Sequence, residues 1–135
     1  MKSRIVIVAS RFNETYVNGL VNSALAALKN QTVEVIRVPG AFEIPLAVQR
    51  AIRASKPQAV IALGVIWQGQ TLHAEFLGRT VTDALMRISL ERDTPVVHQI
   101  LCVKSEAEAR ARCFGKKLNR GREAAETALA LLKDN

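Results

Sequence analysis

Four short runs of apolar residues, many of them β-branched, recur along the chain with more polar segments between them. They cover residues 4–9, 33–38, 59–66 and 96–103, and each has the length of a strand. The first and third runs are apolar nearly throughout, which is typical of strands covered on both faces. The pattern therefore predicts four strands, of which residues 59–66 form the most hydrophobic.

The segments between these runs show the periodicity of helices. Apolar side chains recur at i, i+3, i+4 and i+7, the stripe of a helix that packs on one face. A proline in the first turn of one predicted helix, Pro45, is tolerated because its missing N–H would be unpaired there. Ser105 followed by acidic residues is typical of a helix start. The main predicted helices cover residues 15–29, 43–54, 74–91 and 120–133.

The strict alternation of strands and helices sets the fold class. Such an order requires crossover connections, which are right-handed, and gives a parallel sheet with helices on both faces. The chain has 135 residues and contains no repeat, linker or low-complexity stretch. We therefore expect a single α/β domain over residues 1–135.

Composition narrows the class of protein further. Hydrophobic residues make up 49% and aromatic residues only 4%, so the core must be aliphatic. No apolar run approaches the roughly 20 residues that span a bilayer. The apolar run of residues 5–8 is too short for the h-region of a signal peptide, and we expect it to form the first strand. Two cysteines, Cys102 and Cys113, are too few for a disulfide framework, and we interpret them as reduced thiols in a cytoplasmic protein.

The formal charge of +7 is unevenly placed. Between residues 104 and 122 there are seven basic and two acidic side chains, which leaves +5 in this stretch. It could be a solvated helical face, a site for a phosphate-bearing substrate or a nucleic-acid surface. The stretch has one aromatic residue, Phe114, and no nucleic-acid recognition motif, so nucleic acid is the least favoured partner.

Unusual residues gather in the loops that follow the predicted strands. In an open parallel sheet, ligands bind outside the carboxyl ends of the strands. Residues 10–13, 39–43 and 67–73 follow the first three strands and contain three of the six aromatic residues and one of the two histidines. The sequence therefore predicts a small-molecule site on these loops.

Two of these loop residues have both a structural and a functional interpretation. Phe12 could stack on a flat heterocycle, or it could pack against the first helix. Glu43 lies three residues after Gly40 at a predicted helix start, where a carboxylate is stabilised by the helix dipole. Ordinary helix capping is the favoured role for Glu43, and accepting hydrogen bonds from sugar-like hydroxyls is the alternative.

The third loop has a residue spacing similar to that of a phosphate-binding P-loop. Residues 64–71 have its spacing, but Gln70 occupies the position of the essential lysine, so we reject a nucleoside triphosphatase. Gly69 and Thr71 could still bind a single phosphate at the start of the following helix. His73 lies beside them and is a candidate proton-transfer residue.

Other common catalytic arrangements are missing from the sequence. The two histidines are far apart and nothing has the spacing of paired zinc ligands, so we predict no metal site. No Gly-x-Ser-x-Gly elbow is present for a serine nucleophile.

Four segments together resemble the lumazine synthase family, in order and at fitting spacings. They are residues 11–13 (RFN), 39–45 (PGAFEIP), 69–73 (GQTLH) and 119–121 (NRG). PGAFEIP is the most specific, and the resemblance extends over essentially the whole chain. It implies a flavodoxin-like three-layer sandwich with a four-stranded parallel sheet. It also implies a transferase of riboflavin biosynthesis that needs no cofactor.

The resemblance implies a reaction between two small molecules. 5-Amino-6-(D-ribitylamino)uracil condenses with 3,4-dihydroxy-2-butanone 4-phosphate to 6,7-dimethyl-8-ribityllumazine, and phosphate and water are released. The family forms homo-oligomers built from pentamers, with sites shared between neighbouring subunits. A membrane partner is not implied.

The resemblance also assigns site residues by their positions in this sequence. Phe12 would stack on the pyrimidine ring, Glu43 would accept from ribityl hydroxyls and His73 would transfer protons. The remaining contacts to ribitylaminouracil would come from Ala41, Phe42, Val65, Ile66 and Trp67. The contacts to the butanone phosphate would come from Gln70, Thr71 and Arg112.

Several positions depart from the family pattern. His98, which we expect at the end of the fourth strand and among the ribitylaminouracil contacts, replaces a common phenylalanine. Gln68, Gln70 and Ala74 replace a frequent arginine, a small residue and an aromatic residue. Phe114 and Leu118 stand where capsid-forming members have glycines, which leaves free pentamer, decamer and capsid open.

Two other functions are compatible with the same scaffold. A non-catalytic lumazine- or flavin-binding protein would need Phe12 and Glu43 but not His73 or Arg112. Because both of the latter are present, an enzyme is favoured. A scaffold protein that binds nucleic acid is the other alternative.

Overall fold

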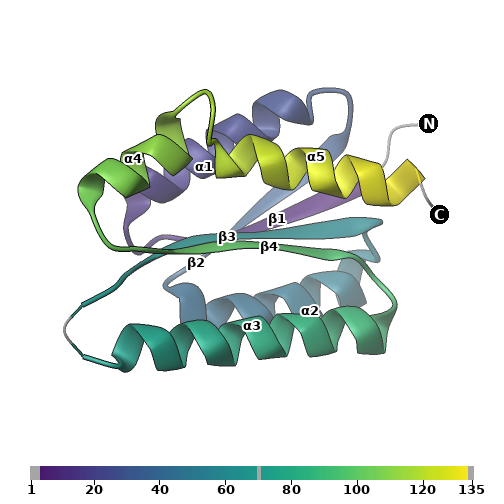
Figure 1. The fold of residues 1–135 in the computed structure, drawn as a ribbon. Helices are drawn as coiled ribbons and strands as arrows, with labels where there is room; N and C mark the ends of the chain where they lie inside the picture. Colours follow the sequence, from purple (N-terminus) through teal and green to yellow (C-terminus); the bar gives the residue numbers. More distant parts are fainter. Residues whose placement is uncertain (1–3, 70, 134–135) are drawn as a thin grey trace.

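A four-stranded parallel sheet forms the middle of the molecule, in the order β2-β1-β3-β4 (Figure 1). The structure, a computed structural model, describes residues 4–69 and 71–133. All three strand pairs are parallel, as the alternating pattern predicts. The strands are β1 (Arg4–Ser10), β2 (Thr32–Val38), β3 (Ala59–Trp67) and β4 (Val96–Val103).

Helices cover both faces of the sheet, so the predicted flavodoxin-like three-layer sandwich is confirmed (Figure 1). One face carries α1 (Glu14–Ala27), α4 (Glu106–Phe114) and α5 (Arg120–Lys133). The other carries α2 (Ile44–Ser55), preceded by a 3-10 turn (Ala41–Glu43), and α3 (His73–Arg92). Within the described part of the chain, no helix combines the length and apolarity needed to cross a membrane.

The two central strands divide their side chains between two cores. Ile5 and Ile7 of β1 are fully buried in the core beneath α1 and α5. Val6 and Val8 are fully buried in the core above α2 and α3. Successive side chains of a strand point to opposite faces, so a strand covered on both sides must be apolar at every position. This requirement explains the continuous apolar run that β1 shows in the sequence.

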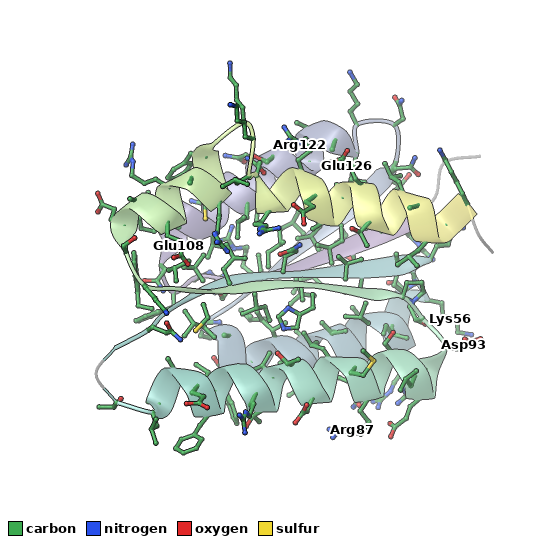
Figure 2. All side chains as sticks on the ribbon, in the orientation of Figure 1. Lys56, Arg87, Asp93, Glu108, Arg122 and Glu126 are labelled. Carbon is green, nitrogen blue, oxygen red and sulfur yellow. The ribbon has the colours of Figure 1, made fainter. Side chains whose placement is uncertain are left out.

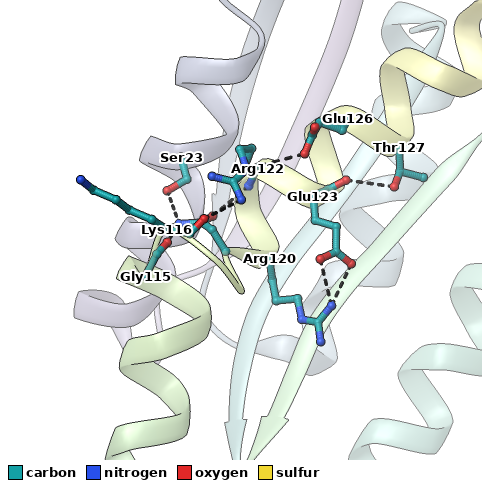
Figure 3. A network of polar contacts seen from close by, with 9 residues as sticks. Ser23, Gly115, Lys116, Arg120, Arg122, Glu123, Glu126 and Thr127 are labelled. Atoms are coloured by element: carbon teal, nitrogen blue, oxygen red, sulfur yellow. Dashed lines mark hydrogen bonds and ion pairs between the residues drawn. The ribbon is translucent and has the colours of Figure 1, made fainter.

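A buried asparagine joins α1 to the loop before α5. The side-chain amide of Asn119 donates to Ser23 Oγ at 2.9 Å and to the Gly115 carbonyl oxygen at 3.0 Å. Its Oδ1 accepts from the backbone N–H of Arg122 at 2.9 Å, which satisfies a free donor in the first turn of α5. The surrounding polar network is drawn in Figure 3.

Part of the basic stretch is neutralised on α5 itself. Arg120 contacts both carboxylate oxygens of Glu123, at 2.8 and 3.0 Å (Figure 3). Arg122 lies 3.6 Å from the carboxylate of Glu126 and also donates to the Lys116 carbonyl oxygen. These ion pairs favour the solvated helical face as the interpretation of these two arginines.

Both cysteines are free thiols. Cys113 is buried against α1, and burial raises the pKa of its thiol to about 11. Cys102 is exposed, and desolvation together with the Glu108 carboxylate, labelled in Figure 2, raises its pKa. Neither thiol is activated as a nucleophile.

We expect Gly121→Ala to destabilise the fold, because a Cβ at this position would overlap the backbone carbonyl oxygen of Leu20. Neighbouring backbone cannot move as a flexible side chain does, so the cost should be about 1–3 kcal/mol. Urea unfolding followed by circular dichroism measures it.

Gly78→Ala is the matched control, because it lies in α3 and its added Cβ would meet nothing within 4 Å. It should leave the free energy of unfolding unchanged or raise it by up to about 1 kcal/mol, since alanine favours helix. Equal stability changes in the two variants would show that α1 and α5 are not in close contact at Gly121.

Candidate functional site

A cleft of about 460 Å³ opens where the strands end at their carboxyl termini. Its walls come from the loops after β1, β2 and β3 and from the first turns of α3. Most residues that the sequence assigns to a site line it together. They are Phe12, Ala41, Phe42, Glu43, Val65, Ile66, Trp67, Thr71 and His73.

Backbone hydrogen bonds hold the first two loops against each other. The N–H of Arg11 donates to the Val38 carbonyl oxygen at 2.7 Å, and the N–H of Phe12 donates to the Pro39 carbonyl oxygen at 2.9 Å. These bonds continue the contact between β1 and β2 beyond the last strand residues. Phe12 is thereby placed beside the turn that carries Gly40 and Glu43.

Two phenylalanines stand at the cleft with their rings in solvent. Phe12 is 70% exposed and Phe42 is 64% exposed. A phenylalanine that packs against a helix buries most of its surface. The exposure of Phe12 therefore favours stacking on a ligand over packing against the first helix.

Glu43 takes part in capping and still has an oxygen available to a ligand. Its Oε1 accepts from the backbone N–H of Gly40 at 2.8 Å, which is one half of a capping box, since glycine has no side chain to form the other half. Its Oε2 receives no hydrogen bond from the residues that the structure describes. The structural and functional interpretations of this carboxylate are thus compatible.

Trp67 is held at the end of β3 by a residue of another loop. Its indole N–H donates to Asn13 Oδ1 at 2.9 Å, and its ring meets that of Tyr16 edge-on, with centroids 5.6 Å apart. Asn13 also lines the cleft, although its position in the sequence did not by itself predict a role there. The available signal was an asparagine in a turn, a residue type that tolerates left-handed backbone.

The first turn of α3 forms one end of the cleft. Thr71 Oγ1 accepts from the His73 backbone N–H at 3.3 Å, which leaves the hydroxyl proton free to donate. The positive end of a 20-residue helix favours an anion here. His73 is exposed in this turn. Gln70, the remaining residue assigned to the phosphate in this loop, lies outside the described residues.

His98 is not at the end of the fourth strand, so that expectation is wrong. β4 begins at Val96, directly after Pro95, and His98 therefore lies near the strand's beginning. It lines a separate hollow of about 350 Å³ beside α3 rather than the cleft. Ile100 donates its N–H to Nδ1 at 3.2 Å, which puts the ring proton on Nε2, 2.8 Å from Thr82 Oγ1.

Arg112 also lies away from the cleft of its own chain. It belongs to α4, on the opposite face of the sheet from α3, and does not line the cleft (Figure 1). It makes no ion pair with the residues that the structure describes. A role for Arg112 at the phosphate therefore requires a second chain.

The polar groups of the cleft suit an organic ligand with an anionic end. Within residues 4–69 and 71–133, no group of three or more His, Cys, Asp or Glu side chains could hold a metal ion. One wall is aromatic and aliphatic, and the turn at α3 supplies hydroxyl and N–H donors. Such a cleft can bind a flat ring and a phosphate side by side.

Comparison with known proteins points to one family. The model of the 6,7-dimethyl-8-ribityllumazine synthase family matches residues 2–135. The protein of that name from Xanthomonas campestris pv. campestris strain B100 is 36% identical over 135 residues, covering 96% of this chain and 88% of the relative. Its counterpart from Nitrobacter hamburgensis is 38% identical over 138 residues, with 97% and 85% covered. That from Halorhodospira halophila is 37% identical, with 96% and 86% covered.

We expect His98 to titrate below the ordinary histidine pKa of about 6.5, because burial disfavours its charged form. The unfolded chain then binds more protons than the folded chain between the two pKa values. The free energy of unfolding should therefore fall as the pH drops below about 6.5.

NMR titration of the two imidazoles measures this, and His98→Phe identifies the resonance and removes that part of the pH dependence. An imidazole of residue 98 that titrates at or above about 6.5 would contradict a half-buried histidine that is neutral in the folded chain.

Proposed function

The chain belongs to the 6,7-dimethyl-8-ribityllumazine synthase family, and from this premise we propose that it catalyses the reaction of that name. In this reaction 5-amino-6-(D-ribitylamino)uracil condenses with 3,4-dihydroxy-2-butanone 4-phosphate, and phosphate and water leave. The chain is thus a transferase of riboflavin biosynthesis. The observation that carries the proposal is the cleft that Phe12, Glu43 and His73 line together from three separate loops.

The aromatic end of the cleft takes the ribitylaminouracil. The exposed ring of Phe12 stacks on the pyrimidine, and Trp67 with its β3 neighbours forms the facing wall. Glu43 accepts hydrogen bonds from ribityl hydroxyls through Oε2, while Oε1 stays on the Gly40 N–H. The remaining ribitylaminouracil contacts on this side come from Ala41, Phe42, Val65 and Ile66.

The end of the cleft at the first turn of α3 binds the phosphate of the four-carbon substrate. Thr71 and Gln70 precede α3, and the N-terminus of this helix supplies N–H donors and a positive dipole end. Arg112 adds the full positive charge that a phosphate dianion needs. The distance from the phosphate to the pyrimidine is then set by the single loop that joins β3 to α3.

For this reaction the protein needs to hold the two substrates next to each other and to transfer protons. The 5-amino group of the pyrimidine is already a nucleophile, so no activated serine or cysteine is required. Its attack on the ketone gives an imine, and phosphate loss, ring closure and dehydration follow. Holding the two reactants in register can supply roughly 7–11 kcal/mol of the barrier reduction. His73, exposed at the same end of the cleft, transfers the protons.

The site is completed by a neighbouring subunit. His98 and Arg112 do not line the cleft of their own chain, and β4, which carries His98, is an edge strand open to a second chain. With both ring nitrogens engaged, His98 offers the neighbour's pyrimidine a neutral ring wall. Large apolar side chains exposed along α3 support burial between subunits. They are Leu72, Phe76, Met86 and Leu90.

We propose pentamers as the basic assembly and the cytoplasm as the compartment. A closed ring repeats the same contact around its axis, so every cleft receives its neighbour's residues. Free thiols such as Cys102 persist in a reducing compartment.

Incubation of the purified protein with both substrates tests the proposal, followed by lumazine fluorescence and by phosphate release in the same sample. Equal amounts of lumazine and phosphate above the uncatalysed rate are expected. Tight binding of ribitylaminouracil without either product would identify a non-catalytic binding protein instead.

His73→Ala should keep measurable turnover, because placement of the substrates remains intact. Loss of a general acid–base group lowers kcat by about 10²- to 10⁴-fold. Steady-state kinetics on the assembled variant measures the effect. Complete inactivity of a correctly assembled His73→Ala protein would contradict a mechanism that depends mainly on proximity.

Arg112→Ala should raise KM for the butanone phosphate, by roughly 10- to 100-fold for the loss of a charge-assisted hydrogen bond. Co-assembly of Arg112→Ala with His73→Ala tests where the arginine acts. In a randomly mixed ring, about a quarter of the clefts combine an intact His73 with a neighbour's intact Arg112. Activity at low butanone phosphate should then exceed that of either variant alone.

The control is a mixture of the two variants assembled separately, which should show only the sum of their own activities. If co-assembled rings also show only that sum, Arg112 does not act across the subunit boundary.

A further inference from the structure

The side chain of Asn13 forms hydrogen bonds with β3 and none with its own helix, α1. Asn13 occupies the N-cap position of α1, where asparagine ordinarily accepts a hydrogen bond from the first turn, yet no such bond is present. Instead its Nδ2 donates to the Val65 carbonyl oxygen at 2.6 Å, and its Oδ1 accepts from Trp67 Nε1 at 2.9 Å. One amide thus binds two residues at the end of β3.

The backbone of Asn13 is shaped for this contact. Its φ of 62° and ψ of 42° lie in the left-handed region, which costs free energy for most side chains but little for asparagine. This turn directs the amide away from α1 and toward β3. The conformation therefore matches a role in the cleft rather than in helix capping.

The two bonds restrict the indole that faces the cleft. Trp67 is the last residue of β3 and is partly buried, with its N–H held by Asn13 and its ring held edge-on at 84° by Tyr16. A side chain fixed before a ligand arrives loses less entropy when the ligand binds. Trp67 is also the only tryptophan of the chain, so its fluorescence reports this site alone.

We propose that Asn13 is a positioning residue, which fixes the Trp67 indole as a preformed wall for the pyrimidine ring of ribitylaminouracil. The role in substrate binding rests on the function proposed above, whereas the fixing of the indole does not. Asn13 acts mainly through Trp67, so most of its contribution to binding should be lost once the indole N–H is removed, and only the bond to the Val65 carbonyl oxygen then remains.

Three variants test this dependence. Asn13→Gly keeps the left-handed backbone accessible and removes the amide. Trp67→Phe keeps an aromatic ring but removes the N–H donor, and the double variant completes the cycle. Asn30→Gly is the matched control, because Asn30 is an exposed turn residue at the far end of α1.

The first measurement needs no substrate. Time-resolved anisotropy of Trp67 should show faster local motion of the indole in Asn13→Gly than in the unaltered protein and Asn30→Gly. Unchanged indole motion in a folded Asn13→Gly would overturn the proposal, whatever the protein catalyses.

The second measurement is kinetic. Asn13→Gly should raise KM for ribitylaminouracil about three- to tenfold and leave KM for the butanone phosphate unchanged. In the Trp67→Phe background the same substitution should raise this KM by a much smaller factor, because only the bond to the Val65 carbonyl oxygen is then lost. An equal rise of KM in both backgrounds would show that Asn13 acts independently of Trp67, which would also overturn the proposal.

The two measurements separate this proposal from the proposed function. Absence of turnover in the unaltered protein would end the proposed function, while the anisotropy would still decide whether Asn13 fixes the indole.

Discussion

The parallel pairing of β1 with β3 at the centre of the sheet is the constraint on which the other features depend. Ile7 of β1 pairs with Ile61 of β3, and both are fully buried. Because each strand is covered by helices on both faces, the central positions, residues 5–9 of β1 and 59–66 of β3, are apolar or glycine throughout. Parallel pairing also brings the carboxyl ends of the strands to one edge. The cleft consequently lies at that edge, where the loops after β1, β2 and β3 meet.

The cleft is preorganised by bonds between these loops. Backbone bonds from Arg11 and Phe12 tie the first loop to the second. The amide of Asn13 ties the first loop to the end of the third strand. Each connection joins segments far apart in the sequence, and each would be lost if one strand shifted its register. These loop-to-loop bonds hold the exposed walls of the cleft in place above the buried sheet.

Local patterns were sufficient to predict the fold. Apolar periodicity located the strands and helices, and their alternation determined the parallel topology. The loop residues Phe12, Glu43 and His73 could be placed near one another for the same reason, since strand ends meet at one edge. The capping bond of Glu43 to Gly40 was foreseeable too, because it depends on a spacing of three residues.

What the sequence could not predict depends on contacts between distant segments or between chains. The bonds from Asn13 to β3 need the three-dimensional position of residues more than fifty apart. Arg112 is placed on the far face of the sheet from α3, so its role at a phosphate can be stated only for an assembly.

The central claim is that a flat ring and a phosphate are held together at the strand ends, with one cation supplied by a second chain. A crystal structure of the assembled protein with ribitylaminouracil and inorganic phosphate tests it directly. We expect the ring against Phe12 and the phosphate at the first turn of α3, within hydrogen-bond distance of a neighbouring subunit's Arg112. A ring bound outside this cleft, or a phosphate that no arginine of a neighbouring chain reaches, would contradict the account.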